Sequence, residues 1–290
     1  MAIRFLSFDV YIMVKVDAHQ HFWKYDPKKL SWISDRMQVL KQDYLPPDLK
    51  SEMDKSGYQA CVAVQASQSE AETDFLLDLA DQYDFVKGVV GWVDLCDYNV
   101  KSRLAHYAQH PKLCGIRHIV HDEPDDYFLL RPDFMRGVKM LPDFDLSFDI
   151  LIFEKHLPAA LQFVSYLPEC RLVVDHIAKP KIASGEVDPW EENIRSLASY
   201  PNVYCKLSGM LTEADWKNWK VSDFKVYLDV VFEAFGTDRL MIGSDWPVCR
   251  LAGEYQEVMA VVEDYMEHFS PEEQAKVLGQ NAIDFYKLSI

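Results

Sequence analysis

Eight short apolar runs, rich in valine, isoleucine and cysteine, alternate along the chain with stretches of helical periodicity. Most of the runs are continuously apolar, which is typical of parallel strands buried on both faces. We therefore predict strands at 13–18, 58–66, 86–94, 113–120, 146–152, 171–177, 202–209 and 239–246. Eight strand–helix alternations in 290 residues predict an α/β fold, a single-domain (β/α)8 TIM barrel.

The stretches between these runs carry helix signals. Residues 69–83 begin with Ser69 and have Glu72 three residues later, which is a capping-box pattern. Further helices are predicted at 157–167, 189–200, 222–236 and 270–288. A doubly wound sheet is the alternative, but no glycine-rich dinucleotide or phosphate loop follows any predicted strand.

The barrel domain is predicted to span residues 13–290, because no linker or change of composition divides them. Residues 1–12 are interrupted by Arg4, Ser7 and Asp9 and contain no small-residue cleavage site. They predict neither a membrane span nor a signal peptide, so we treat them as an N-terminal extension.

The net charge limits the binding partners that we expect, and the cysteines indicate the cellular compartment. The formal charge of −16 argues against nucleic acid and against an anionic membrane surface. The six cysteines are scattered, without a CxxC motif, and several lie in apolar runs, which predicts reduced thiols in a cytoplasmic enzyme. We expect a small-molecule substrate, and the sequence leaves self-association of the chain open.

Polar side chains gather where the predicted strands end, which is where TIM barrels build active sites. The stretch "VDAHQHFW" places His19 and His21 two residues apart, so both point to one side of an extended chain. His176 ends the sixth predicted strand and Asp245 the eighth. Alone, the pair could be turn histidines and Asp245 a helix cap. Their convergence in a closed barrel indicates an active site.

Other polar and aromatic residues belong to the same end of the barrel. Long loops are predicted at 22–47, 121–134, 178–189 and 210–220, and the first of them would make a rim or lid. Candidates for substrate contact, each with barrel packing or surface placement as the alternative, are Arg117, His118, Lys179, Lys206, Trp23 and Trp246. The two tryptophans flank the histidine pair and Asp245, where they could stack on a sugar-like ring.

The stretches "DAHQHFW", "GIRH", "FDILI", "HLPAA", "VVDHIAKP", "CKLSG" and "IGSDWPV" together resemble the lactonase branch of the amidohydrolase superfamily. The sugar lactonases (L-fuconolactonases and L-rhamnonolactonases) are the nearest members, and the pyrone-dicarboxylate lactonases are more distant. The resemblance runs from Val16 to the C-terminal helix. It implies a hydrolase that opens the lactone of a small sugar acid to the aldonate.

The resemblance also implies roles for the converging residues. Asp245 would act as general base for water, while His19, His21 and His176 would polarise the carbonyl or hold a metal. Arg117 and Lys179 match positions that grip substrate polar groups. Arg117 is the only arginine at a strand end facing the mouth, which favours a monosaccharide lactone over a dicarboxylated one.

The sequence does not decide whether the active site binds a metal ion. Metal-dependent relatives add a histidine on the fifth strand, or a bridging lysine or glutamate, whereas "SFDILIFEKH" has no histidine within the strand. Glu154 and His156 come late, and His156 is better interpreted as a helix-start residue. The candidate ligands are therefore His19, His21 and Asp245, and the cofactor is either none or one divalent ion such as zinc.

Two alternatives remain. The barrel could be a metal-dependent decarboxylase of the amidohydrolase type, or another hydrolase of C–O or C–N bonds. More distantly, it could bind a ligand without turning it over. Buried histidines and aspartates destabilise a fold unless they are paired, which counts against that last hypothesis.

Overall fold

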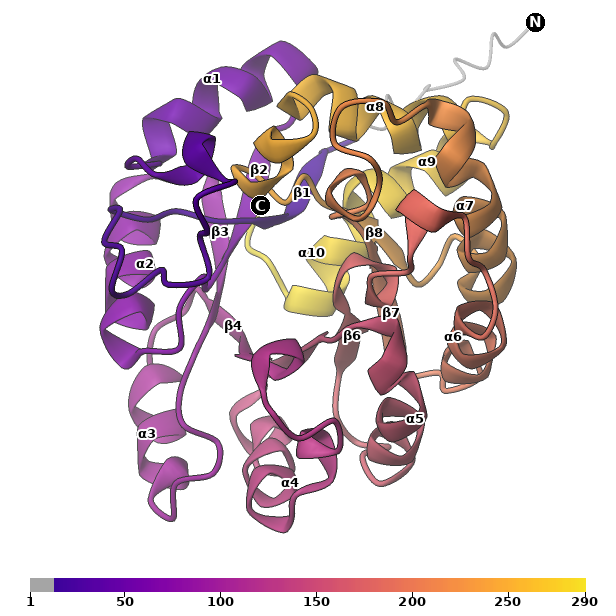
Figure 1. Ribbon diagram of the computed structural model, residues 1–290. Coiled ribbons are helices and arrows are strands. Elements are labelled where there is room, and N and C mark those ends of the chain that lie inside the picture. Colours follow the sequence, from indigo (N-terminus) through magenta and orange to yellow (C-terminus); the bar gives the residue numbers. More distant parts are fainter. Residues whose placement is uncertain (1–12) are drawn as a thin grey trace, which may run out of the picture.

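Eight parallel strands follow one another in chain order and curl into a barrel (Figure 1). The computed structural model describes residues 13–290, and the predicted extension at 1–12 lies outside the described residues. The strands are β1 Val16–Gln20, β2 Ala60–Val64, β3 Val86–Gly91, β4 Leu113–Ile119, β5 Ser147–Leu151, β6 Leu172–Val174, β7 Val203–Leu207 and β8 Leu240–Ile242. The predicted TIM barrel is confirmed. β6 and β8 are shorter than predicted because their polar ends leave the sheet and form loops.

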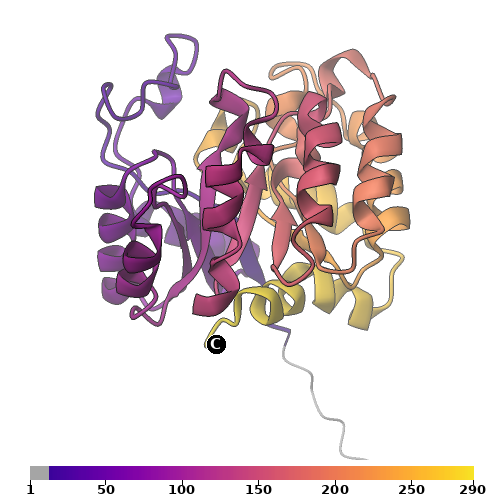
Figure 2. The ribbon, with the colours of Figure 1, turned by 90° about the horizontal axis from the view of Figure 1, so that it is seen from below.

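Helices surround the barrel (Figures 1 and 2). They are α1 Pro46–Ser56, α2 Glu70–Gln82, α3 Val100–Tyr107, α4 Pro132–Val138, α5 Leu157–Ser165, α6 Trp190–Ala198, α7 Val221–Phe235, α8 Tyr255–Tyr265, α9 Pro271–Ala275 and α10 Asn281–Tyr286. The Ser69 hydroxyl accepts from the backbone N–H of Glu72, as the capping pattern predicts. The predicted closing helix is divided into α9, a π-helical turn and α10. Within residues 13–290, no helix combines the length and the apolar character that crossing a bilayer requires.

Two apolar cores lie on either side of the strands. The larger fills the layer between strands and helices. The smaller fills the barrel interior, where Val62, Val90 and Val173 meet Phe285 and Tyr286 of α10. In Figure 2 the C-terminal helices lie across one end of the barrel. α10 therefore closes that end and leaves the other for a site.

The seam between β8 and β1 positions the predicted histidines and aspartate. The Asp245 N–H donates to the His19 carbonyl at 2.8 Å, and the His21 N–H donates to the Trp246 carbonyl at 2.7 Å. A Cβ on Gly243 would lie 2.6 Å from the Cβ of His19, so only glycine permits this approach. The closing seam thus fixes Asp245 beside the histidine pair.

Candidate active site

A cavity of about 300 Å³ opens at the carboxyl ends of the strands. Its polar lining residues include His21, Arg117, His176, Lys179, Glu213 and Asp245. Its apolar lining residues include Trp32, Ile119, Leu151, Phe153, Trp216 and Leu251. The site therefore offers both hydrogen-bonding groups and an apolar surface to one small molecule.

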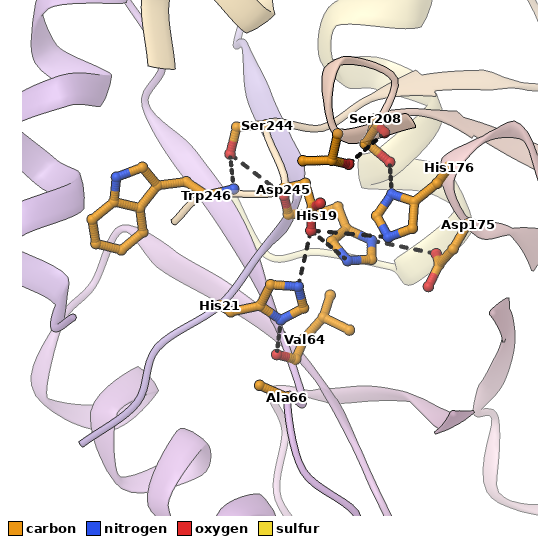
Figure 3. Close-up of polar contacts among 12 residues, drawn as sticks. His19, His21, Val64, Ala66, Asp175, His176, Ser208, Ser244, Asp245 and Trp246 are labelled. Atoms are coloured by element: carbon orange, nitrogen blue, oxygen red, sulfur yellow. Dashed lines mark hydrogen bonds and ion pairs between the residues drawn. The ribbon is translucent and has the colours of Figure 1, made fainter. Parts of the chain in front are cut away.

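Three imidazoles converge on one carboxylate oxygen at the floor of this cavity (Figure 3). The distances from Asp245 Oδ1 are 3.1 Å to His21 Nε2, 3.8 Å to His19 Nε2 and 3.9 Å to His176 Nε2. All four side chains are buried. The sequence prediction that these four residues meet is thus matched by their placement.

Each imidazole is oriented by a different partner of its other nitrogen (Figure 3). His21 Nδ1 lies 2.7 Å from the Val64 carbonyl, and His176 Nδ1 lies 2.9 Å from Ser208 Oγ. His19 Nδ1 lies 3.3 Å from Asp175 Oδ1. Because these contacts fix the rings, all three Nε2 atoms point toward Asp245.

The backbone at two of these residues is in the left-handed region. His176 has φ 55° and Asp245 has φ 56°, conformations that non-glycine residues adopt rarely. Positive φ continues through Ile177 and Ala178 to Lys179, so one left-handed turn carries both His176 and Lys179 into the cavity. Such strain gathers at functional sites, where the surrounding structure has to hold it in place.

Burial and neighbouring charges determine the protonation states of the ionisable side chains that line the cavity. Burial opposes ionisation of the Asp245 carboxyl, but His176 and His21 outweigh it and lower its pKa. Burial holds the pKa of His176 well below the usual value, and it lowers the pKa of His121 at the cavity wall to about 3. The lowered pKa keeps the Asp245 carboxyl ionised at neutral pH.

A layer of paired charges adjoins the floor and includes Arg117 of the cavity wall. Arg117 Nη1 lies 3.0 Å from Asp175 Oδ2 and 3.2 Å from His19 Nε2. Lys206 Nζ lies 3.0 Å from Asp175 Oδ1 and 2.6 Å from Asp149 Oδ2. Burial opposes ionisation of Asp175, but Lys206 and His19 outweigh it and hold its pKa well below the usual range. The pKa of Asp149 rises to about 6 because burial outweighs Lys206.

Several predicted substrate contacts lie away from the cavity. His118 alternates with Arg117 on β4, so it faces outward, stacks on Phe128 with ring centroids 4.7 Å apart and lies 2.7 Å from Glu123. Lys206 is completely buried below the floor. These two residues therefore do not line the cavity, contrary to prediction.

The predicted tryptophans also point elsewhere. Trp23 and Trp246 both pack edge-on against Tyr44, with centroids 5.5 and 5.1 Å apart, and hold the long loop after β1 against the barrel. Trp32 and Trp216 line the cavity instead. Both come from segments predicted as loops, 22–47 and 210–220. Their position in these loops was the feature of the sequence that could have identified them as cavity residues.

Three more of the residues near the predicted strand ends, His19, His156 and Asp175, are absent from the cavity lining. His19 is fully buried and lies behind the wall rather than on it. His156 Nδ1 accepts from the backbone N–H of Phe153 at 3.1 Å, directly before α5, so its interpretation as a helix-start residue holds. Asp175 directly precedes His176 at the polar end of the sixth predicted strand, but the sequence prediction assigned it no catalytic or binding role.

The donor set fits one divalent cation. A carbonyl only accepts, so His21 Nδ1 carries the ring proton and its Nε2 lone pair faces Asp245 Oδ1. His21 Nε2 and Asp245 Oδ1 would repel one another at this separation unless a proton or a metal ion lay between them. Among residues 13–290, ligand atoms of His19, His21 and Asp245 lie within 4.8 Å of one another. A second group, His19, Asp175 and His176, also meets this limit, but Lys206 and Arg117 already engage its carboxylate.

Comparison with known proteins places this site among related ones. The sequence profile of the amidohydrolase family matches residues 16–288. An L-fucono-1,5-lactonase from Burkholderia ambifaria is 39% identical over 278 residues, covering 94% of this chain and 96% of the relative. An L-fucono-1,5-lactonase from Burkholderia multivorans is 41% identical over 286 residues, covering 95% and 96%.

A solved structure agrees with this similarity. An amidohydrolase from Burkholderia multivorans with bound zinc superposes with a TM-score of 0.90 at 41% identity. The match covers 95% of this chain and all of that one. The compared region is therefore nearly the whole of this chain.

Proposed function

The chain belongs to the amidohydrolase family, and from that membership we propose that it hydrolyses the lactone of a small sugar acid to the open-chain aldonate. The identity to two L-fucono-1,5-lactonases over nearly the full length supports this activity. The observation that carries the proposal is the buried Asp245 carboxylate, which faces the cavity among three fixed imidazoles.

The cavity supports a deoxy sugar acid as substrate. Trp32, Leu151 and Trp216 offer apolar surface, which suits the face of a six-membered ring and a methyl substituent. Lys179 and Glu213, 2.7 Å apart at the wall, offer a donor and an acceptor for ring hydroxyls. L-Fucono-1,5-lactone, a 6-deoxy lactone, is therefore the first substrate to test.

In the proposed reaction Asp245 acts as the general base. Its carboxylate takes a proton from water while the water oxygen attacks the lactone carbonyl carbon. Arg117, Lys179 and His176 line the same cavity and are the groups available to stabilise charge on the carbonyl oxygen. The ring C–O bond then breaks, and Asp245 returns the proton to the departing ring oxygen. General base catalysis of this kind contributes about 10²- to 10⁴-fold.

We also propose that the same centre binds one divalent cation such as zinc. His19, His21 and Asp245 would hold it, and Arg117, which now donates to His19 Nε2, would have to give way. When bound, the ion would polarise the lactone carbonyl and lower the pKa of bound water. A zinc-bound relative supports this assignment.

The cysteines support a proposal about the cellular setting. All six are free thiols, which supports a reducing compartment, and we propose the cytoplasm. A small lactone is the partner that the cavity size supports.

The test is a pH-indicator assay of lactone hydrolysis. Purified protein is mixed with a panel of aldono-1,4- and 1,5-lactones, with and without Zn²⁺ or Mn²⁺, and compared with spontaneous hydrolysis. Acid release from L-fucono-1,5-lactone well above the spontaneous rate is expected. A panel without any enzymatic hydrolysis would refute the function.

A further inference from the structure

An ion pair at the cavity wall joins two of the loops that follow the strands. Lys179 Nζ lies 2.7 Å from Glu213 Oε1, and both residues line the cavity. Lys179 ends the left-handed turn after β6, and Glu213 ends the 3₁₀ helix Leu211–Glu213 after β7. Their side chains are mostly buried, with exposed fractions of 14% and 21%. The pair is therefore a charged but largely desolvated part of the surface that a substrate contacts.

The surroundings of the two residues hold their charges in place. The Lys179 backbone N–H donates to the His176 carbonyl at 2.8 Å, and Lys179 Nζ lies 5.9 Å from the centroid of the Phe153 ring. The Glu213 backbone N–H donates to the Met210 carbonyl at 3.1 Å. The aromatic ring stabilises the ammonium, and the hydrogen bonds close the two turns. We therefore expect the ammonium and the carboxylate to stay paired in the absence of substrate.

Both side chains with a permanent positive charge at the cavity wall already have carboxylate partners. Lys179 pairs with Glu213, and Arg117 Nη1 lies 3.0 Å from Asp175 Oδ2. His121 also lines the cavity, but burial, Lys179 and Arg117 lower its pKa to about 3, so it is neutral at pH 7. Among residues 13–290, the cavity lining thus contains no lysine or arginine that lacks a carboxylate partner.

A lactone that also carries a carboxylate would be unfavourable in this cavity. Besides Glu213 and Asp245, the lining includes Asp122, so its carboxyl groups outnumber its lysine and arginine side chains. An ionised substrate group would lose hydration without gaining an unpaired cation, and the carboxylates would repel it. A neutral hydroxyl avoids this penalty, because it can accept from Lys179 and donate to Glu213.

We propose that Glu213 is a specificity-determining residue: by neutralising Lys179, it makes the cavity select neutral sugar lactones over lactones that carry an ionised carboxyl group. This role rests on the proposed lactonase function and defines its substrates by charge. Proteins often achieve selectivity through a feature that disfavours the wrong ligand, and Glu213 is such a feature. A pair that only joined the two loops would not distinguish between ligands of different charge.

The experiment compares two ligands that differ at one carbon. D-Glucono-1,4-lactone and D-glucaro-1,4-lactone share the same ring, and C6 is a hydroxymethyl group in the first and a carboxylate in the second. Glu213→Gln removes the negative charge but keeps a side-chain oxygen that can accept from Lys179. Glu186→Gln is the matched control, because Glu186 pairs with Lys181 at 3.3 Å on the exposed surface.

The first readout is binding, measured by isothermal titration calorimetry at pH 7. Each protein also carries Asp245→Asn, so that the lactones stay closed during the titration, and circular dichroism establishes that it is folded. Glu213→Gln is expected to shift the ratio of the two dissociation constants toward the anionic lactone on the order of tenfold, as a new hydrogen bond to a charged group does. Glu186→Gln should leave the ratio unchanged. Addition of Lys179→Met to Glu213→Gln should cancel the shift, because it removes the unpaired ammonium.

Three binding results would overturn the proposal. An unchanged ratio in Glu213→Gln, with both affinities reduced alike, would show that the pair only joins the loops. A shift that persists after Lys179→Met would show that the ammonium does not bind the added carboxylate. The third is the absence of measurable binding of either lactone to any variant, up to the solubility limit of the lactone.

The second readout is kinetic and uses the proteins with Asp245 intact. The wild type is expected to have the higher kcat/KM for the neutral lactone, and Glu213→Gln should narrow the difference between the two lactones about tenfold. Wild-type selectivity in Glu213→Gln contradicts the proposed role. If the wild type hydrolyses no lactone, the proposed function fails, and the binding ratios still decide the role of Glu213.

Discussion

His21 Nε2 and Asp245 Oδ1 face one another at 3.1 Å, although the Val64 carbonyl at 2.7 Å assigns the His21 ring proton to the opposite nitrogen. Two lone pairs at this distance repel unless a proton or a metal ion lies between them. We therefore propose that this contact is the position at which a positive centre binds. The proposed cation binding and the proposed activation of water would both depend on this arrangement.

Removal of His21 should abolish binding of a divalent cation. Metal-stripped wild-type protein is expected to take up one equivalent of Zn²⁺ in isothermal titration calorimetry, and His21→Ala none at the same concentration. His268→Ala, which changes an exposed histidine, should bind like the wild type. Undiminished zinc binding by His21→Ala would place the ion elsewhere.

The glycine behind His176 should resist substitution more than another glycine of the same conformation. Gly209 has φ +61°, and a Cβ there would lie 2.5 Å from His176 Nδ1. Gly185 has φ +69° with nothing within 4 Å of its would-be Cβ. Gly185→Ala should therefore cost only the backbone penalty of about 1–2 kcal/mol in the free energy of unfolding. Gly209→Ala should cost clearly more and also lower kcat, measured by urea unfolding and lactone hydrolysis. Equal effects at both positions would show that the His176 contact is irrelevant.

Trp216 should contribute to substrate binding. Its half-buried side chain belongs to the apolar cavity wall, so Trp216→Ala removes surface that a sugar ring would cover. We expect KM for the lactone to rise about tenfold, equivalent to about 1.4 kcal/mol, with a smaller change in kcat. Tyr98→Ala, at an aromatic side chain that is 87% exposed, is the control and should leave both constants unchanged. An unchanged KM in Trp216→Ala would remove this wall from the binding site.

Thiol reagents should react slowly with the native protein. Cys96 is only partly buried, and burial with the nearby Asp133 raises its pKa to about 11. The thiolate fraction, and with it the iodoacetamide rate, should therefore increase about tenfold per pH unit above neutrality until the pH reaches the pKa. Mass spectrometry of protein alkylated at several pH values checks this. Rapid, stoichiometric labelling at pH 7 would contradict the raised pKa.

The barrel itself could be predicted from the sequence because its strands are buried on both faces. A short, continuously apolar run such as that of β2 is typical of a strand inside a parallel sheet, and the order of such runs determines the order around the barrel. The convergence of His19, His21, His176 and Asp245 follows from the same topology. Each lies at or just past a strand end, and parallel strands bring those ends together.

The direction of side chains was harder to predict. Arg117 and His118 are neighbours in the sequence, and only the register of β4 decides that Arg117 faces the interior. Which tryptophans line the cavity depends on the path of the loops, and the periodicity of a sequence does not predict a loop's path. Lys206 looked like a substrate contact because it lies on a strand, but its height along the barrel axis places it below the floor. Loop paths and depth in the barrel are tertiary properties, so a single sequence carries little information about them.

The most direct test of this account is the rate at which the wild type and Asp245→Asn hydrolyse L-fucono-1,5-lactone, both measured against spontaneous opening. Asparagine keeps the shape of the side chain but cannot take a proton from water. We predict that the wild type opens the lactone and that Asp245→Asn, shown by circular dichroism to be folded, loses about 10²- to 10⁴-fold in kcat. A folded Asp245→Asn with wild-type kcat would contradict the account.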